Sequence, residues 1–397
     1  MPRNDPPRPV HRGPLPAGFL GLVAIVLLAE STVVRHELDL ANVGAANYQF
    51  ARKNWRKAIG ADLVAMGDSQ IKQGVLPEVL ERTLGGHAYN LAIGGASAPP
   101  AFFLLRRLVE SGARPEAIVV DFKARNLAED PLRDFRGFAE LLDDADRRDL
   151  ARTAADPSLY GGFTVASILP SVRSRSEILF GGRRWLFGVE NTNRYRYFPH
   201  WRNWRVNSGA QVNPKSKGME DTTFIGDELP YILPDWRCHP LNAAYVTKFL
   251  DLAAAHAIRV VWLVPPMNPL TQAIRDHHDL DAPYAEYLRD TLASHPGLTL
   301  LDARAIGYPR ALFADSCHLD RDGAARFSAD LAAWIAERRR SGWGGSPRWS
   351  NLTSRAEAAP GALALEDVEQ SDLALQERTI PPPRQVAADP TPARARR

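Results

Sequence analysis

The stretch ADLVAMGDSQ, residues 61–70, decides the fold that we expect for this chain. Its first six residues are mostly apolar and end at a glycine, a pattern typical of a short buried strand. The turn that follows carries Gly67, Asp68 and Ser69. We expect this turn to hold the hydroxyl of Ser69 exposed at the carboxyl edge of a sheet.

Further apolar stretches follow the same pattern, and helical stretches separate most of them. The expected strands cover residues 88–93, 117–122, 258–266 and 298–303, and the expected helices lie around residues 75–84, 99–112, 241–257, 284–295 and 319–339. Strands that alternate with helices predict an α/β fold with a parallel sheet of about five strands, covered on both faces. A long insertion of about residues 127–240 interrupts the alternation.

Two residues near the end of the folded region complete a candidate catalytic set with Ser69. Asp315 lies three residues before His318, in the run FADSCHLDRDG. At this spacing the carboxylate can hold the Nδ1 proton of the imidazole while Nε2 faces the serine hydroxyl. Ser69, His318 and Asp315 are therefore the predicted nucleophile, base and orienting acid. Asp68 is adjacent to the nucleophile, so we expect it to make a structural hydrogen bond within the turn.

With these motifs in this order, the chain resembles the SGNH (GDSL-like) hydrolase superfamily, in particular its membrane-anchored bacterial members that modify exopolysaccharides or cell walls. The resemblance covers roughly residues 62–338, with the insertion as an interruption. It implies a three-layer, flavodoxin-like fold. It also places Ser69 in the first sequence block of the family, and Asp315 and His318 in the last.

The resemblance further implies an oxyanion hole, in which the backbone amides of Ser69 and of Gly94, or of its neighbour Gly95, would take part. A glycine lets the backbone approach a bound acyl group closely. The third block departs from the family, because no clean GxND follows the third strand, where the chain reads IVVDFKARNLAED. Asn126 is the nearest candidate for the missing side-chain donor. Asn268 is a weaker substitute because it follows a later strand.

Composition excludes several other classes of protein. The 397 residues, 45% of them apolar, suffice for one full α/β core with flanking pieces. A formal net charge of +3 gives no support for nucleic-acid binding. Cys238 and Cys317 either stay unpaired or form one disulfide that braces the loop of His318. The densest metal-like cluster, at residues 277–279, contains adjacent histidines that do not face one site, so we expect neither a metal nor a cofactor.

The N-terminus has the pattern of a targeting segment. A leader with three arginines precedes an apolar run from Leu15 to Ala29, which Glu30 interrupts before Val34. The run fits a signal peptide, and with Glu30 tolerated it approaches the roughly twenty residues of a membrane span. Leu27 stands where a signal peptidase needs a small residue, which favours an uncleaved anchor. The basic leader places the N-terminus in the cytoplasm and the remainder outside, on the periplasmic side.

These patterns predict five regions. They are a cytoplasmic leader (1–14), an anchor helix (15–34), a helical stalk (35–60), a hydrolase-like domain (61–340) and a disordered tail (341–397). The insertion concentrates aromatic residues among arginines, an arrangement that suits packing, membrane headgroups or sugar recognition. Trp201 and Trp204 are the candidates for substrate binding, should the cluster bind a glycan.

Three functions are compatible with the sequence. The leading expectation is an extracytoplasmic serine esterase or O-acyltransferase, and the resemblance points to O-acyl groups of a surface glycan as its substrate. A second is a catalytically inactive scaffold or carbohydrate-binding component, which the imperfect third block permits. A third is a lipase or thioesterase, for which an anchor near lipid would be useful.

Overall fold

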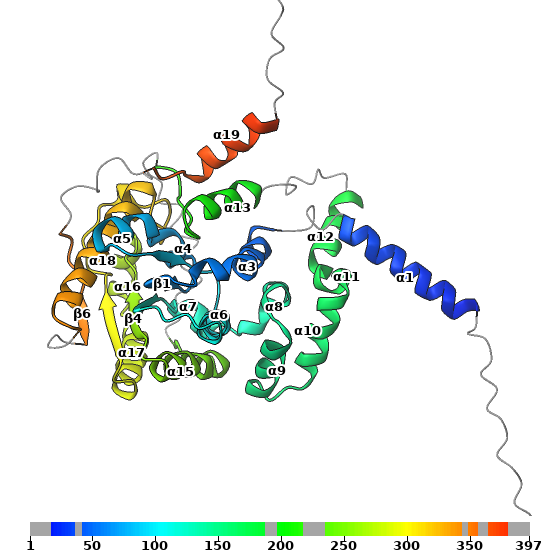
Figure 1. The fold of residues 1–397 in the computed structure, drawn as a ribbon, viewed down its shortest axis with the longest axis horizontal. Helices are drawn as coiled ribbons and strands as arrows, with labels where there is room; N and C mark the ends of the chain where they lie inside the picture. Colours follow the sequence, from blue (N-terminus) through cyan, green and yellow to red (C-terminus); the bar gives the residue numbers. More distant parts are fainter. Residues whose placement is uncertain are drawn as a thin grey trace, which may run out of the picture.

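A six-stranded sheet forms the centre of the protein (Figure 1). The computed structural model describes residues 17–35, 42–186, 197–216, 235–343, 348–355 and 364–379. The strands are β1 (Leu63–Met66), β2 (Ala88–Asn90), β3 (Ala117–Val120), β4 (Arg259–Val264), β5 (Leu298–Asp302) and β6 (Trp349–Asn351). They lie in the order β2-β1-β3-β4-β5-β6, and every neighbouring pair is parallel. The predicted parallel α/β sheet is confirmed, with six strands instead of about five.

Helices cover both faces of the sheet. Successive side chains of each strand point to opposite faces, so each strand contributes to two cores. Val64 and Met66 of β1 pack into the core beneath α6 (Ala98–Glu110) and α15 (Pro240–Ala255). Leu63 and Ala65 pack into the core beneath α5 (Pro77–Leu84) and α18 (Arg321–Arg340). Strands buried on both faces need continuous apolar runs, and all four residues of β1 and of β3 are buried.

Helices of very different length connect and flank the strands. In the sheet domain they are α3 (Val43–Asn54), α4 (Ser69–Gly74), α5 (Pro77–Leu84), α6 (Ala98–Glu110), α15 (Pro240–Ala255), α16 (Pro269–His277), α17 (Ala282–Ser294) and α18 (Arg321–Arg340). The insertion contributes α7 (Ala124–Ala128), α8 (Phe135–Leu141), α9 (Asp144–Thr153), α10 (Ser158–Ile168), α11 (Pro170–Arg173), α12 (Arg175–Leu186) and α13 (Tyr197–Val206). Short 3-10 helices lie at Trp55–Ala58, Pro131–Arg133 and Arg310–Leu312.

Helix α3 belongs to the folded domain, although the sequence pattern places it in a stalk. It packs against α8 of the insertion and against α13. The ring of Phe50 lies 5.3 Å from that of Trp201 and 5.4 Å from that of Trp204. The ammonium group of Lys72, on α4, lies 4.7 Å from the centre of the Trp204 ring, and burial lowers the pKa of Lys72 to about 7.

Part of the expected tail is also folded. Strand β6 extends the sheet beside β5, with Trp349 opposite Leu300. Helix α19 (Val368–Thr379) packs on α13, and just before it Glu366 accepts two hydrogen bonds from the guanidinium group of Arg202, at 2.6 and 2.8 Å. Residues 380–397 and the basic leader lie outside the described residues.

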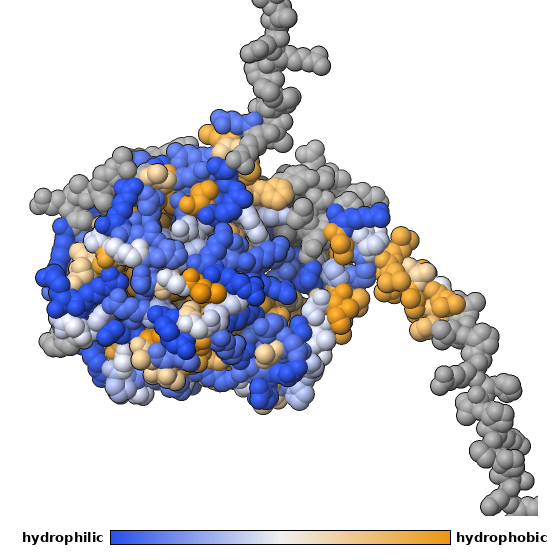
Figure 2. Space-filling model, in the orientation of Figure 1, coloured by the Kyte–Doolittle hydropathy of each residue, from blue (hydrophilic) through white to orange (hydrophobic). Residues whose placement is uncertain are grey.

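One helix in the described part of the chain is long and apolar enough to cross a membrane. It is α1 (Ala17–Arg35), in which residues Gly18–Arg35 form the qualifying window, and a signal sequence would pass the same test. Figure 2 shows its apolar side chains exposed beside the mostly hydrophilic domain. Glu30 in α1 accepts hydrogen bonds from the backbone N–H of Ser171, at 3.0 Å, and from its hydroxyl, so this end of α1 contacts α11.

Candidate active site

The turn after β1 presents Ser69 at the carboxyl edge of the sheet. Gly67 has φ +126° and lies against the backbone of Asp121, at the end of the neighbouring strand β3. Asp68 then caps α4, and its Oδ1 accepts a hydrogen bond from the backbone N–H of Gln70 at 2.8 Å. This is the structural hydrogen bond expected for Asp68. Ser69 begins the helix and remains partly exposed, as the strand-to-turn pattern predicts.

Ser69, His318 and Asp315 form one hydrogen-bonded chain. The Oγ of Ser69 lies 2.8 Å from Nε2 of His318, and Nδ1 of His318 lies 2.6 Å from Oδ2 of Asp315. Nδ1–H donates to the carboxylate when Nε2 is the free base, which leaves Nε2 positioned to accept the serine proton. The structure thus brings together the three residues that the sequence singled out, with each facing the partner that its predicted role requires.

The loop of residues 314–319, here called the Asp–His loop, is held in place by several backbone hydrogen bonds. The second carboxylate oxygen of Asp315 accepts from the backbone N–H groups of Cys317, at 2.9 Å, and of His318, at 2.7 Å. The side chain of Gln70 donates to the carbonyl of Cys317 at 3.1 Å, which ties the loop to α4. Asn268 donates its backbone N–H to the carbonyl of Ser316 at 3.1 Å. Asn268, weighed above as an oxyanion donor, therefore braces this loop.

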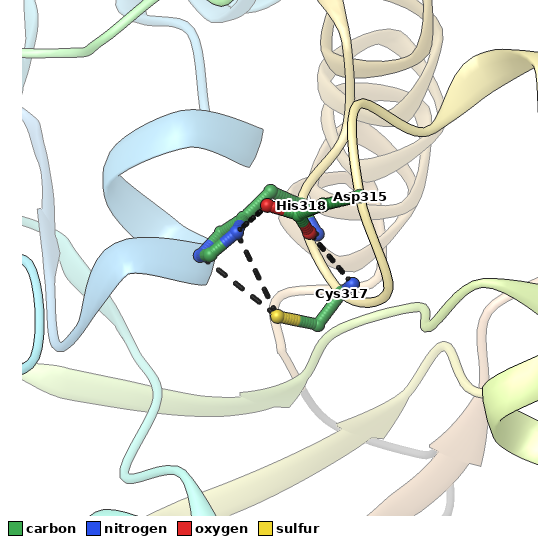
Figure 3. Close-up of side chains that lie close together, drawn as sticks. All are labelled: Asp315, Cys317 and His318. Carbon is green, nitrogen blue, oxygen red and sulfur yellow. Dashed lines mark hydrogen bonds and ion pairs between the residues drawn. The ribbon is translucent and has the colours of Figure 1, made fainter. Parts of the chain in front are cut away.

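The environment lowers the pKa of Asp315 and raises the pKa of His318. Burial raises the pKa of Asp315, but the hydrogen bond and charge of His318 outweigh burial and hold that pKa below its usual value. Burial lowers the pKa of His318, but Cys317 and the carboxylate of Asp315 raise it more, so that pKa lies above its usual value. Figure 3 shows the thiol of Cys317 beside the imidazole, with Sγ 3.7 Å from Nδ1.

We expect this raised pKa to set the acid limb of the activity. Only neutral His318 can accept the serine proton, so kcat/KM should rise with pH through a pKa higher than the usual value of about 6.5. Cys317→Ala removes one group that raises the pKa of His318, so the acid limb should move to lower pH, whereas Cys238→Ala should not move it. The measurement is kcat/KM against pH for each variant. If kcat/KM of the parent protein rises with an apparent pKa at or below about 6.5, His318 is not the base with a raised pKa that controls the activity.

Asn126 is close to the site but its amide is occupied. Its Nδ2 donates to Oδ2 of Asp68 at 3.2 Å and to the carbonyl of Ala96 at 3.0 Å. Both of its hydrogens thereby connect the turn of Ser69 to the loop after β2. To stabilise an oxyanion, Asn126 would have to give up one of these bonds.

Asp121, which the sequence pattern does not single out, faces Asp68. Burial, together with the charge of Asp68, raises the pKa of Asp121.

Gly94 lies directly opposite the serine. A Cβ built on Gly94 would stand 3.8 Å from Cβ of Ser69 and 3.0 Å from Nδ2 of Asn47. The absence of a side chain at position 94 therefore keeps open the space next to the nucleophile, as expected for a residue that lines an oxyanion hole. Gly95 has φ +75° and is exposed, with no atom near its own absent Cβ.

The two tryptophans proposed for substrate binding pack against Phe50 of α3. Trp204 is fully buried, and its Nε1 donates to Oε1 of Gln211 at 3.0 Å. Trp201 is half-buried against Phe50 of α3. This part of the aromatic segment packs α13 onto the domain, so Trp204 offers no surface to a glycan. Trp185 and Tyr195 fall on residues whose side chains lie outside the described set.

A pocket lies beside the triad, at the carboxyl ends of β3 and β4. It encloses about 700 Å³, part of which is open to solvent, and Gln70 on its wall is the residue after Ser69. Trp236 and Val264 contribute to its apolar wall. Its charged residues are Lys123, Arg125, Arg275 and Arg304 together with Asp121 and Asp281, and Asp281 pairs with both Arg275 and Arg304. A pocket of this composition suits a polar group next to an apolar one.

The two cysteines are free in the structure, so no disulfide braces the Asp–His loop. The possible ligand atoms of Asp315, Cys317 and His318 lie within 4.8 Å of one another, close enough for a metal ion. The two ring nitrogens of His318, however, face Asp315 and Ser69. This pairing suits proton transfer better than coordination, because a ligating nitrogen must be turned to the metal.

No family model matches this chain, and no curated protein matches it.

Proposed function

We propose that this chain is a serine esterase or O-acyltransferase of the SGNH type. The single observation that carries the proposal is the hydrogen-bonded chain from Ser69 through His318 to Asp315, at 2.8 and 2.6 Å. The strand order supports it, because β2-β1-β3-β4-β5 is the 2-1-3-4-5 order of flavodoxin-like sheets. Ligands of such sheets bind beyond the carboxyl ends of the strands, where the order reverses, and Ser69 follows β1 at that point.

The reaction begins when Oγ of Ser69 attacks the carbonyl carbon of an ester while Nε2 of His318 accepts the hydroxyl proton. The tetrahedral intermediate collapses, the bond to the alcohol oxygen breaks, and His318 returns the proton to the leaving alcohol. Water or an acceptor hydroxyl then attacks the acyl-enzyme, with His318 again taking and returning the proton. Water completes a hydrolysis, and an acceptor hydroxyl completes a transfer.

We infer that the substrate is an O-acylated glycan outside the cytoplasm. Helix α1 and the basic leader support an anchor with the site on the periplasmic side. The charged residues of both signs in the pocket favour a polar group over the long alkyl chain of a lipase substrate. The inactive scaffold is the alternative, and it predicts a serine without enhanced reactivity.

Labelling with a serine-directed phosphonate tests the proposal. The detergent-solubilised full chain should be labelled with one equivalent at Ser69, because this is the serine hydroxyl that His318 contacts among the described residues. Ser69→Ala should abolish labelling without lowering the melting temperature appreciably, whereas Ser158→Ala, at an exposed serine of the insertion, should leave it intact. Mass spectrometry of the labelled peptide gives the site. A folded parent protein that takes up no label would support the scaffold instead.

A further inference from the structure

We propose that Asn47 is the side-chain donor of the oxyanion hole, in place of the residue that usually follows the third strand. This inference rests on the proposed function and deepens it. Asn47 lies on α3, before the first strand of the sheet, where the sequence pattern gives no reason to look for a catalytic residue. Three observations on the described residues carry the inference.

The first observation is that the amide of Asn47 makes no hydrogen bond to the described residues. The residue is 5% exposed, and its Oδ1 is buried without a hydrogen-bond partner. Within the described residues Nδ2 donates to no acceptor, and it is not among the buried unpaired atoms. A buried Oδ1 without a partner costs stability, and a catalytic role is one reason for which such a group is kept.

The second observation is the direction in which this amide points. The position of a Cβ on Gly94 would be 3.0 Å from Nδ2 of Asn47 and 3.8 Å from Cβ of Ser69. The amide and the serine thus face the same open space from two sides. An ester carbonyl attacked by Oγ would place its oxygen in this space, within reach of Nδ2–H and of the backbone amides nearby.

The third observation is that Asn47 is held more firmly than a loop residue would be. Its neighbours Ala46 and Tyr48 are 0% and 1% exposed, and α3 is fixed between α8 and α13. A donor on such a helix needs no reorganisation as charge develops. Asn126, by contrast, already spends both amide hydrogens on Asp68 and Ala96.

Asn47→Leu tests the inference, because leucine has a similar size and no polar group. We expect kcat for an ester to fall about 10²- to 10³-fold with little change in KM, since the donor acts on the transition state. Phosphonate labelling of Ser69 should slow in parallel, because the adduct also places an oxygen in the hole. The melting temperature should stay the same or rise, because a buried carbonyl oxygen without a hydrogen-bond partner has been removed. Asn54→Leu, at the end of the same helix, should change neither rate.

The combination of slower chemistry with undiminished stability distinguishes a donor from a structural residue. Loss of stability together with activity would assign Asn47 a packing role and overturn the inference, as would a kcat within threefold of the parent. If the parent is labelled at Ser69 and Asn47→Leu is labelled at the same rate, only the role of Asn47 fails. If the parent is not labelled at all, the proposed function fails first.

Discussion

His318→Ala should lower kcat for any ester that the parent cleaves by about four to six orders of magnitude. Among the described residues, only the imidazole of His318 lies within hydrogen-bond distance of Oγ of Ser69. Its Nε2 is 2.8 Å away. Without it the hydroxyl keeps its proton and is a poor nucleophile. Steady-state kinetics on a short acyl ester, after removal of contaminating esterase activity, provide the measurement. His278→Ala, at an exposed histidine after α16, is the matched control and should retain full activity.

The losses within the triad should not add. Ser69→Ala combined with His318→Ala should be about as slow as either variant alone, because each leaves the other without a function. Asp315→Asn should also cost several orders of magnitude, since it disturbs the tautomer of His318. Near-normal turnover of Asp315→Asn would show that the orienting acid is wrongly assigned. Neither Asp302, which pairs with Arg304, nor Asp320, which caps α18, faces His318 as a replacement.

Gly67→Ala should cause a large loss of stability at the turn that presents Ser69. A Cβ at position 67 would stand 2.4 Å from the carbonyl oxygen of Asp121, which is backbone and cannot rotate away, and φ is +126°. The clash adds about 1 to 3 kcal/mol of overpacking to about 1 to 3 kcal/mol of backbone strain. Relief would require β1 and β3 to separate at the point where Ser69 is presented, so activity should fall as well.

Gly60→Ala separates the two contributions. Gly60 has φ +87°, but nothing lies within 4 Å of its absent Cβ, so only the conformational strain applies there. Chemical denaturation of both variants should therefore show a clearly larger loss for Gly67→Ala. Equal losses would mean that the contact with Asp121 contributes nothing.

The sheet could be predicted well because its signal is local. Apolar runs bounded by glycine or proline predict five strands, and β1 to β5 lie within those runs. Strand β6 was missed, since three residues of mixed polarity, Trp349–Asn351, carry no pattern and pair only because β5 offers a free edge. Helix α19 was likewise assigned to a tail of low apolar content, yet α13 and Arg202 hold it to the domain.

The residues of the candidate site likewise differ in how far the sequence predicts them. A spacing of three residues places Asp315 beside His318, and a strand end presents Ser69, so each part of the triad has a local signal. That the two parts meet across 249 residues was expected only from the order of the motifs and the resemblance that they carry. Trp204 was misjudged because an aromatic residue among arginines looks the same in sequence whether it faces a ligand or packs on Lys72. Asn47 left no signal, because only tertiary packing brings α3 to the loop of Gly94.

The packing of α3 has a practical consequence for expressing a soluble form of this protein. The strand pattern invites truncation near residue 61, which would preserve the whole sheet and all three members of the triad. Such a fragment would lack Asn47 and would uncover the surface of Lys72 and Trp204 that Phe50 covers. It could fold poorly or be inert, and a functional enzyme would then be mistaken for a scaffold. A fragment that begins no later than Asn42, whose side chain caps α3, avoids that error.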